Sequence, residues 1–135
     1  MYRSVWRGDK LIDSCKSNGQ MIHYSSSLGF IMSRMGMVLK MSGNYLDHAG
    51  KVMALKAFGK YNPDVVPVDH IDDLNKLWDF PVIESHLSDQ QYVVDYLSTA
   101  HRYTEQIYLK HFRKFIKPDD IVGYSGGIAQ NTIIN

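Results

Sequence analysis

A long amphipathic segment near the end of the chain constrains the fold most strongly. Apolar residues recur there at helical spacing, which predicts a helix over residues 89–116 with one face turned toward a core. Ser88 is the expected N-cap, and Pro118 ends the helix. At about 1.5 Å per residue this helix is about 40 Å long, so it has to pack against other elements. Its predicted inward stripe consists of Val93, Leu97, Ala100, Tyr103 and Ile107.

Strand and turn signals occupy the first part of the chain. In residues 1–25, β-prone runs are separated by Gly8-Asp9 and by Ser17-Asn18-Gly19, and this order predicts a β-meander. Prolines and acidic residues interrupt residues 60–88, which predicts an irregular connection with one short helix around residues 74–78.

Two further helices are predicted in residues 26–59. Ser42-Gly43-Asn44 separates two runs of apolar residues that recur at helical spacing. The first helix is expected over residues 28–41, and the second begins near Asp47 and stops at Gly59. The methionines of this region are expected to fill the core rather than to form a binding face. They are Met32, Met35, Met37 and Met41.

Residues 89–135 are expected to contain the long helix, a strand and a tight corner. A β-prone run from Ile121 to Tyr124 follows the helix and leads into Ser125-Gly126-Gly127. A long helix joined to a strand in this way predicts an α/β fold with helices packed on a sheet. At 135 residues the chain suits a single domain.

Charge and composition narrow the classes of partner. The chain has 15 basic and 14 acidic residues and a net charge of +1, so no broad field favours nucleic acid or an anionic membrane. The sequence contains no run of about 18 apolar residues that would predict a membrane span. Its one cysteine, Cys15, fits a reducing compartment, and a cytoplasmic location is expected. The six histidines lack the i, i+4 spacing of a helical metal site and are expected at the surface or at caps.

The corner at Gly126 and Gly127 is the strongest local signal for a binding site. Adjacent glycines let the backbone turn tightly and let another molecule approach the main chain. A helix that starts after them presents free N–H groups and a positive dipole end to a phosphate. Ser125 either bonds such a ligand or only forms the turn. Asn131 either points back toward the corner or caps the helix.

Three blocks of sequence add a specific resemblance. They are Ser27-Leu28-Gly29-Phe30-Ile31-Met32-Ser33, Gly50-Lys51-Val52-Met53-Ala54-Leu55-Lys56-Ala57-Phe58-Gly59 and Gly126-Gly127-Ile128-Ala129-Gln130-Asn131, followed by Asn135. In this order they resemble signatures of the carbamoyltransferase family, the O-carbamoylating enzymes of nodulation-factor and antibiotic biosynthesis. The sequence departs from the family at Ser26, where a His is usual, and at Gln130, where a Leu is usual.

The resemblance implies a fold, a reaction and a set of site residues. The fold is a sugar-kinase/actin-like (ribonuclease H-like) nucleotide-binding domain, of which residues 1–135 would be the middle part. The reaction is ATP-dependent O-carbamoyl transfer from carbamoyl phosphate, through a carbamoyl-adenylate, to an acceptor hydroxyl. Gly126 and Gly127 would face the nucleotide, and Asn131 would hold the local polar network. The family also implies a divalent metal, iron or magnesium, whose His-x-x-x-His ligand motif does not occur in this sequence.

Lys51 is the remaining predicted site residue. It matches the Lys of the family's Gly-Lys-Val-Met element and lies near a predicted helix start, where a cation opposes the helix dipole. Its expected partner is therefore an anion, either a phosphate or the carboxylate of Asp47 one turn earlier.

Two other functions fit the same residues. One is that of a threonylcarbamoyl-transferring tRNA-modification relative, which shares the fold and a similar Gly-Gly string. The other is that of a truncated, non-catalytic interaction protein that binds a complementary polypeptide or a second copy of itself. Family members are several times longer than 135 residues, so the chain is expected to be a fragment, a split gene product or a degenerate copy, and to be inactive alone.

Overall fold

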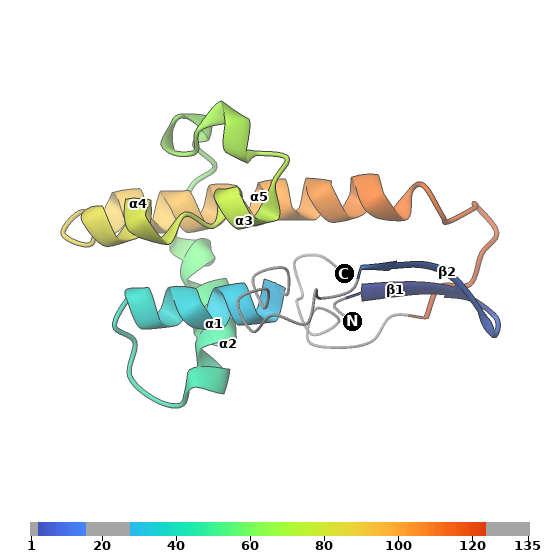
Figure 1. Cartoon of the computed structure of the whole chain (residues 1–135). Helices are drawn as coiled ribbons and strands as arrows, with labels where there is room; N and C mark the ends of the chain where they lie inside the picture. The colour runs from blue at the N-terminus through green and yellow to red at the C-terminus, as the bar shows by residue number, and fades with distance from the viewer. Residues whose placement is uncertain (1–2, 16–27, 124–135) are drawn as a thin grey trace.

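The computed structural model describes residues 3–15 and 28–123. In this part the chain is mostly helical, with one small sheet (Figure 1). Its elements are β1 (Arg3–Arg7), β2 (Lys10–Cys15), α1 (Leu28–Val38), η2 (Tyr45–Asp47), α2 (His48–Leu55), η3 (Lys56–Phe58), η4 (Pro63–Val65), η5 (Val68–His70), α3 (Leu74–Leu77), α4 (Phe80–Ser85) and α5 (Gln90–Phe112).

The two strands form an antiparallel hairpin. Gly8 turns the chain between them with a φ of 60°, a conformation that favours glycine, and a bulge lies between Val5 and Trp6. The hairpin is tied to the end of α5, because Asp13 lies 3.5 Å from His111 and Arg7 donates to the Phe115 carbonyl at 2.9 Å. The first turn of the predicted meander is therefore confirmed. Its second turn lies outside the described residues.

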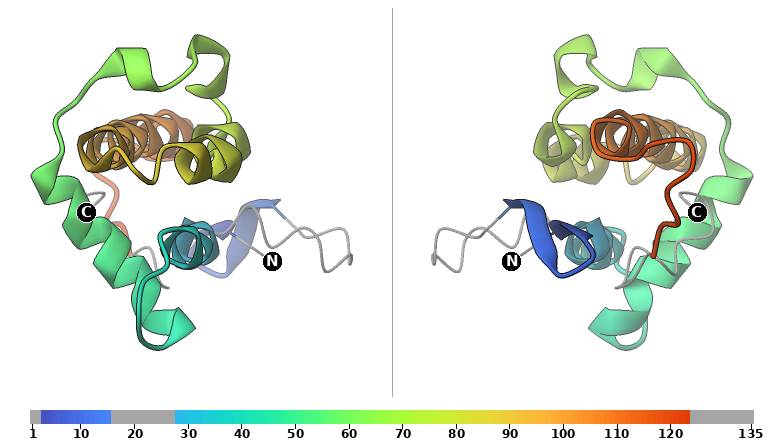
Figure 2. Two further views of the ribbon diagram at one scale, coloured as in Figure 1. Left: turned by 90° about the vertical axis from the view of Figure 1, so that its left-hand side faces the viewer. Right: turned by 90° about the vertical axis from the view of Figure 1, so that its right-hand side faces the viewer.

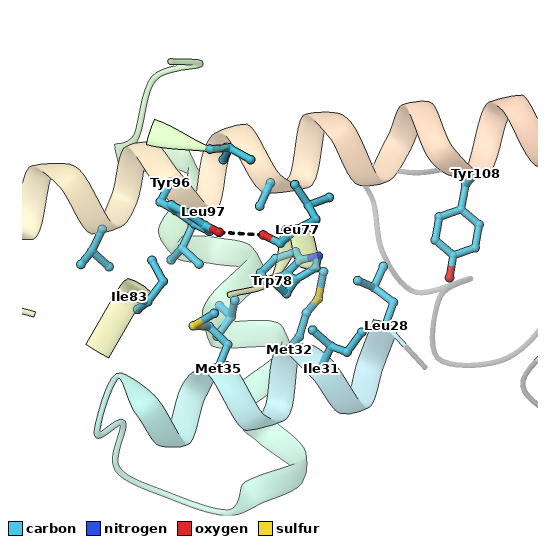
Figure 3. Packing of buried hydrophobic residues seen from close by; sticks show 14 residues of the cluster. Leu28, Ile31, Met32, Met35, Leu77, Trp78, Ile83, Tyr96, Leu97 and Tyr108 are labelled. Atoms are coloured by element: carbon cyan, nitrogen blue, oxygen red, sulfur yellow. Dashed lines mark hydrogen bonds between the residues drawn. The ribbon is translucent and has the colours of Figure 1, made fainter. Parts of the chain in front are cut away.

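The helices form a core between α5 and the α1–α2 pair. Figure 2 shows α5 above α1, with α2 running obliquely along one side of the molecule. Large apolar side chains from α1, α3, α4 and α5 meet in this space (Figure 3). Met32 and Met35 are buried, in agreement with a core role, whereas Met37 is exposed. The fully buried members include Leu28, Ile31, Met32, Met35, Leu77, Trp78, Ile83, Tyr96 and Leu97.

Buried polar groups fix the register of α5 against its neighbours. The Trp78 indole donates to the Thr104 hydroxyl at 3.1 Å, and Thr104 donates to the Ala100 carbonyl at 2.7 Å. The Tyr96 hydroxyl donates to the Leu77 carbonyl at 2.9 Å. Because an unpaired buried polar group destabilises a fold, these bonds favour one packing arrangement over others.

Two glycines allow elements to approach closely. A Cβ at Gly36 would overlap the His48 Cβ and lie 2.7 Å from its Cγ, so α1 and α2 cross where Gly36 has no side chain. A Cβ at Gly59 would overlap the Val94 carbonyl of α5. After Gly59 the chain stays on α5, because Asn62 and Thr99 exchange two hydrogen bonds, at 2.9 and 3.1 Å.

Some sequence predictions on helix bounds need correction. Helix α5 ends at Phe112 rather than at residue 116, and its N-cap is Asp89, which accepts from the Tyr92 N–H at 3.0 Å, rather than Ser88. The short helix predicted around residues 74–78 is confirmed as α3, but the rest of residues 60–88 is less irregular than expected, because the segment also contains η4, η5 and α4. Three of these four begin at an Asx cap, formed by Asn62, Asp73 or Asp79.

The strand predicted from Ile121 to Tyr124 is not found in its described part. Residues 121–123 have no regular structure, and Ile121 is fully exposed. A β-prone run becomes a strand only beside another strand, and the one sheet of the described residues consists of β1 and β2. The described residues nevertheless contain both helices and a sheet, so a mixed α/β composition is confirmed. The nucleotide-binding fold stays a prediction.

Candidate functional site

Lys51 is the predicted site residue that the structure describes. It lies on the exposed side of α2, and its ammonium donates to the Ser42 carbonyl rather than to Asp47. The ammonium also lies above Gly43, whose φ of 102° turns the loop between α1 and η2. Lys51 therefore holds this loop, and of its two expected partners, a phosphate or Asp47, the Asp47 carboxylate is not the group that it contacts. A role in phosphate binding stays a prediction.

The other predicted site residues, Ser125, Gly126, Gly127 and Asn131, lie outside the described residues. The structure thus places one member of the predicted nucleotide site. What it adds concerns the two upstream blocks: residues 28–33 lie on α1, and residues 50–59 form most of α2 and η3. These helices pack against each other, with Leu28, Ile31, Met32 and Val52 in the core.

The glycines of the two blocks differ in what surrounds them. Gly59 is required by the close approach to α5, whereas a Cβ added at Gly29 or Gly50 would meet nothing within 4 Å. Glycine in a helix lowers stability by about 0.5–1 kcal/mol relative to alanine. Packing within the described residues therefore does not explain Gly29 and Gly50.

Three histidines are buried, whereas the sequence predicts histidines at the surface or at caps; of the three, His48 does form the C-cap of η2. They are His48, His101 and His111. His101 is fully buried on α5, and its Nδ1 lies 2.7 Å from the Leu97 carbonyl. Its ring stands edge-on to Trp78, with centroids 4.9 Å apart. A signal was present in the sequence, because His101 is four residues after Leu97 on the inward stripe.

Burial changes the acid–base behaviour of His101. The pKa of His101 is lowered to about 4, mainly because burial desolvates the charged ring. The bond to the Leu97 carbonyl raises this pKa, and the positive charge of Lys56 lowers it; both effects are included in the value of about 4. His101 is therefore neutral at physiological pH. Its Nε2 has no hydrogen-bond partner within the described residues.

A second group of buried polar atoms lies between α1 and α2. The His48 ring is 5% exposed, and neither of its nitrogens has a hydrogen-bond partner in the part of the chain described. The Tyr45 hydroxyl, whose ring lies 6.2 Å from that of His48, has none there either. The His48 ring is packed against the backbone of Gly36.

The described residues do not fit the divalent metal that the resemblance implies. Within residues 3–15 and 28–123, no three His, Cys, Asp or Glu side chains converge as metal ligands would. The unpartnered Nε2 of His101 belongs to a ring that packs edge-on against Trp78 and lies near Lys56, a cation.

None of the described helices has the length and apolar character needed to cross a membrane. Comparison of the sequence and structure with protein-family models, with curated proteins and with solved structures finds no match. The resemblance to carbamoyltransferases thus rests on the three sequence blocks.

Replacing Lys51 with methionine tests its role in the loop. We expect a loss of about 1 kcal/mol in the free energy of unfolding, because the bond to the Ser42 carbonyl is lost while the apolar stem remains. Equilibrium urea denaturation measures this loss. Lys76→Met is the matched control, since Lys76 is exposed on α3 and lies 3.9 Å from its partner Asp69. Equal stability of Lys51→Met and the wild-type chain would contradict the structural role.

Proposed function

We propose that this chain is part of the nucleotide-binding domain of an ATP-dependent O-carbamoyltransferase. The order of the three blocks, at residues 27–33, 50–59 and 126–131, carries the proposal. Carbamoyl phosphate would supply the carbamoyl group, and an acceptor hydroxyl would receive it.

The packing of the first two blocks supports this proposal. Both contribute to one helical unit, α1 with α2 and η3, and Gly59 at the end of the second block joins that unit to α5. The third block follows α5 in the sequence. If the site requires all three blocks, two of them lie on helices that pack against each other.

The physical task of such a domain is to hold a polyphosphate in a fixed place. Backbone N–H groups near Gly126 and Gly127 would bind phosphate oxygens, and the Asn131 amide would hold the corner. Lys51 is the proposed cation of the site. The Lys51 ammonium would have to exchange its bond to the Ser42 carbonyl for one to phosphate.

Calorimetric titration with ATP and Mg²⁺ tests the proposal. We expect saturable binding that Asn131→Ala weakens at least about tenfold, because the substitution removes the amide proposed to hold the corner. Asn75→Ala is the matched control, since Asn75 is exposed on α3. Circular dichroism establishes that each variant is folded. Absence of ATP binding by the folded wild-type chain, or equal binding by the wild type and Asn131→Ala, would refute the proposed site.

A non-catalytic interaction protein is the second candidate function. The observation in its favour is a set of large apolar side chains that stay exposed, among them Leu46 at 76% and Phe58 at 74%. Apolar surface of this kind marks contact sites between proteins when it is contiguous.

A further inference from the structure

The helical run of residues 45–58 has apolar residues on its outer side as well as its inner side. Its inner side buries Val52 and His48 against α1. Its outer side carries exposed Leu46, Gly50, Ala54 and Phe58, which follow one another at intervals of four residues. Large apolar side chains exposed in a row on a surface often mark a contact with another protein. Here the outer side lies at the edge of the molecule (Figure 2).

We propose that this surface, called the α2 face and formed by Leu46, Gly50, Ala54 and Phe58, binds the same surface of a second copy of the chain in antiparallel orientation. Gly50 and Ala54 lie on α2, whereas Leu46 and Phe58 lie on the 3₁₀ turns that flank it. Residues four apart form a ridge along an α-helix, and packing of such ridges is the commonest contact between helices, so Gly50 and Ala54 form the centre of the contact. The large residues lie at the two ends of the ridge and the small ones at its centre. Two helices can therefore approach closely at the centre.

The order of residues makes the α2 face complementary to itself. An antiparallel two-fold contact places Leu46 opposite Phe58 of the second copy and Gly50 opposite Ala54 of the second copy. Large residues then meet large ones and small residues meet small ones. This contact also accounts for Gly50, which packing within the described residues does not explain.

Two charged residues at the ends of the α2 face support a second copy of the chain as its binding partner. Asp47 lies at the N-terminal end of the α2 face and Lys60 lies just beyond its C-terminal end, and both are exposed. Within the described residues, neither the Asp47 carboxylate nor the Lys60 ammonium forms an ion pair. An antiparallel contact brings each Asp47 near Lys60 of the second copy, and it also aligns the two helix dipoles favourably.

Sedimentation analysis of the whole chain over a range of concentrations tests the proposal. We expect a reversible dimer, and we expect Leu46→Glu combined with Phe58→Glu to raise its dissociation constant at least about 100-fold. Gly50→Leu is also expected to raise the dissociation constant. Within one copy the added side chain would enter open space, but in the dimer it would push the two copies apart. Val68→Glu is the matched control, since Val68 is 82% exposed on η5, away from the α2 face.

A charge exchange tests the orientation of the two copies. We expect Asp47→Lys or Lys60→Asp alone to weaken the dimer about tenfold and the double variant to restore it. Circular dichroism and thermal melts identify any variant that fails to fold. If one of the charged variants does not fold, Gly50→Leu still tests whether the α2 face forms the dimer. A chain that is monomeric throughout, a dimer insensitive to Leu46 and Phe58, or a charge exchange without restoration would overturn the proposal.

Discussion

Replacement of Gly59 with alanine is expected to lower the free energy of unfolding by about 3 kcal/mol. The backbone dihedral angles of Gly59, −98° and 163°, are open to any residue, so the cost comes from packing alone. An added Cβ would overlap the Val94 carbonyl and lie 2.9 Å from the Asp95 nitrogen. Both atoms belong to the backbone of α5, so a shift of one flexible side chain would not relieve the overlap.

Equilibrium denaturation of Gly59→Ala and Gly50→Ala side by side measures this effect. Gly50 is the matched control, because it belongs to the same sequence block but its added Cβ would meet nothing within 4 Å. We expect Gly50→Ala to be as stable as the wild type or about 0.5–1 kcal/mol more stable. A loss at Gly59 no larger than the change at Gly50 would show that the segment after η3 does not need its close contact with α5.

Gly59 shows which features a local sequence pattern predicts and which it does not. The pattern of residues 50–59 predicts a helix that stops at Gly59, and the helical run does end there. The reason that the sequence suggests, a left-handed C-terminal glycine, is not the physical one. Contact with Val94 joins residues 35 positions apart, and no local pattern encodes such a contact.

Local signals predicted the helices well when they repeated over many turns. Helix α5 was predicted to within a few residues because its apolar period continues for 23 residues. The four short helices between Asn62 and Ser85 have too few turns for a period. Three of them nevertheless carry an Asx cap that the sequence indicates, as in Asn62-Pro63, where a capping residue precedes proline at the first helical position.

Local sequence patterns predict the contacts of the site residues less well than they predict the helices. The bond from Lys51 to the Ser42 carbonyl depends on the turn at Gly43. Charge pairing along the helix suggested Asp47 instead, since Asp47 and Lys51 are one turn apart. A strand at Ile121 was likewise predicted from residue type, although a strand also requires a neighbouring strand.

The free energy of unfolding is expected to fall by about 3 kcal/mol as the pH falls from about 6.5 to about 4, because of His101 alone. Burial lowers the pKa of His101 in the folded chain to about 4. The unfolded chain therefore binds a proton on His101 in this pH range while the folded chain does not. Since the unfolded state binds more protons, acidification stabilises it relative to the folded state. Below about pH 4 both states are protonated at His101 and its effect stops growing.

Urea denaturation at a series of pH values, with the wild type and His101→Leu, isolates this contribution. Leucine has no titratable proton and fills the apolar space beside Trp78. The variant is expected to lose the steep part of the pH dependence between 6.5 and 4, so that the difference in stability between the two proteins narrows or reverses on acidification. Because all other residues are common to both proteins, their contributions cancel in that difference. Parallel pH profiles would mean that the His101 ring is hydrated or exposed in solution, which is incompatible with its place in the core between Leu97 and Trp78.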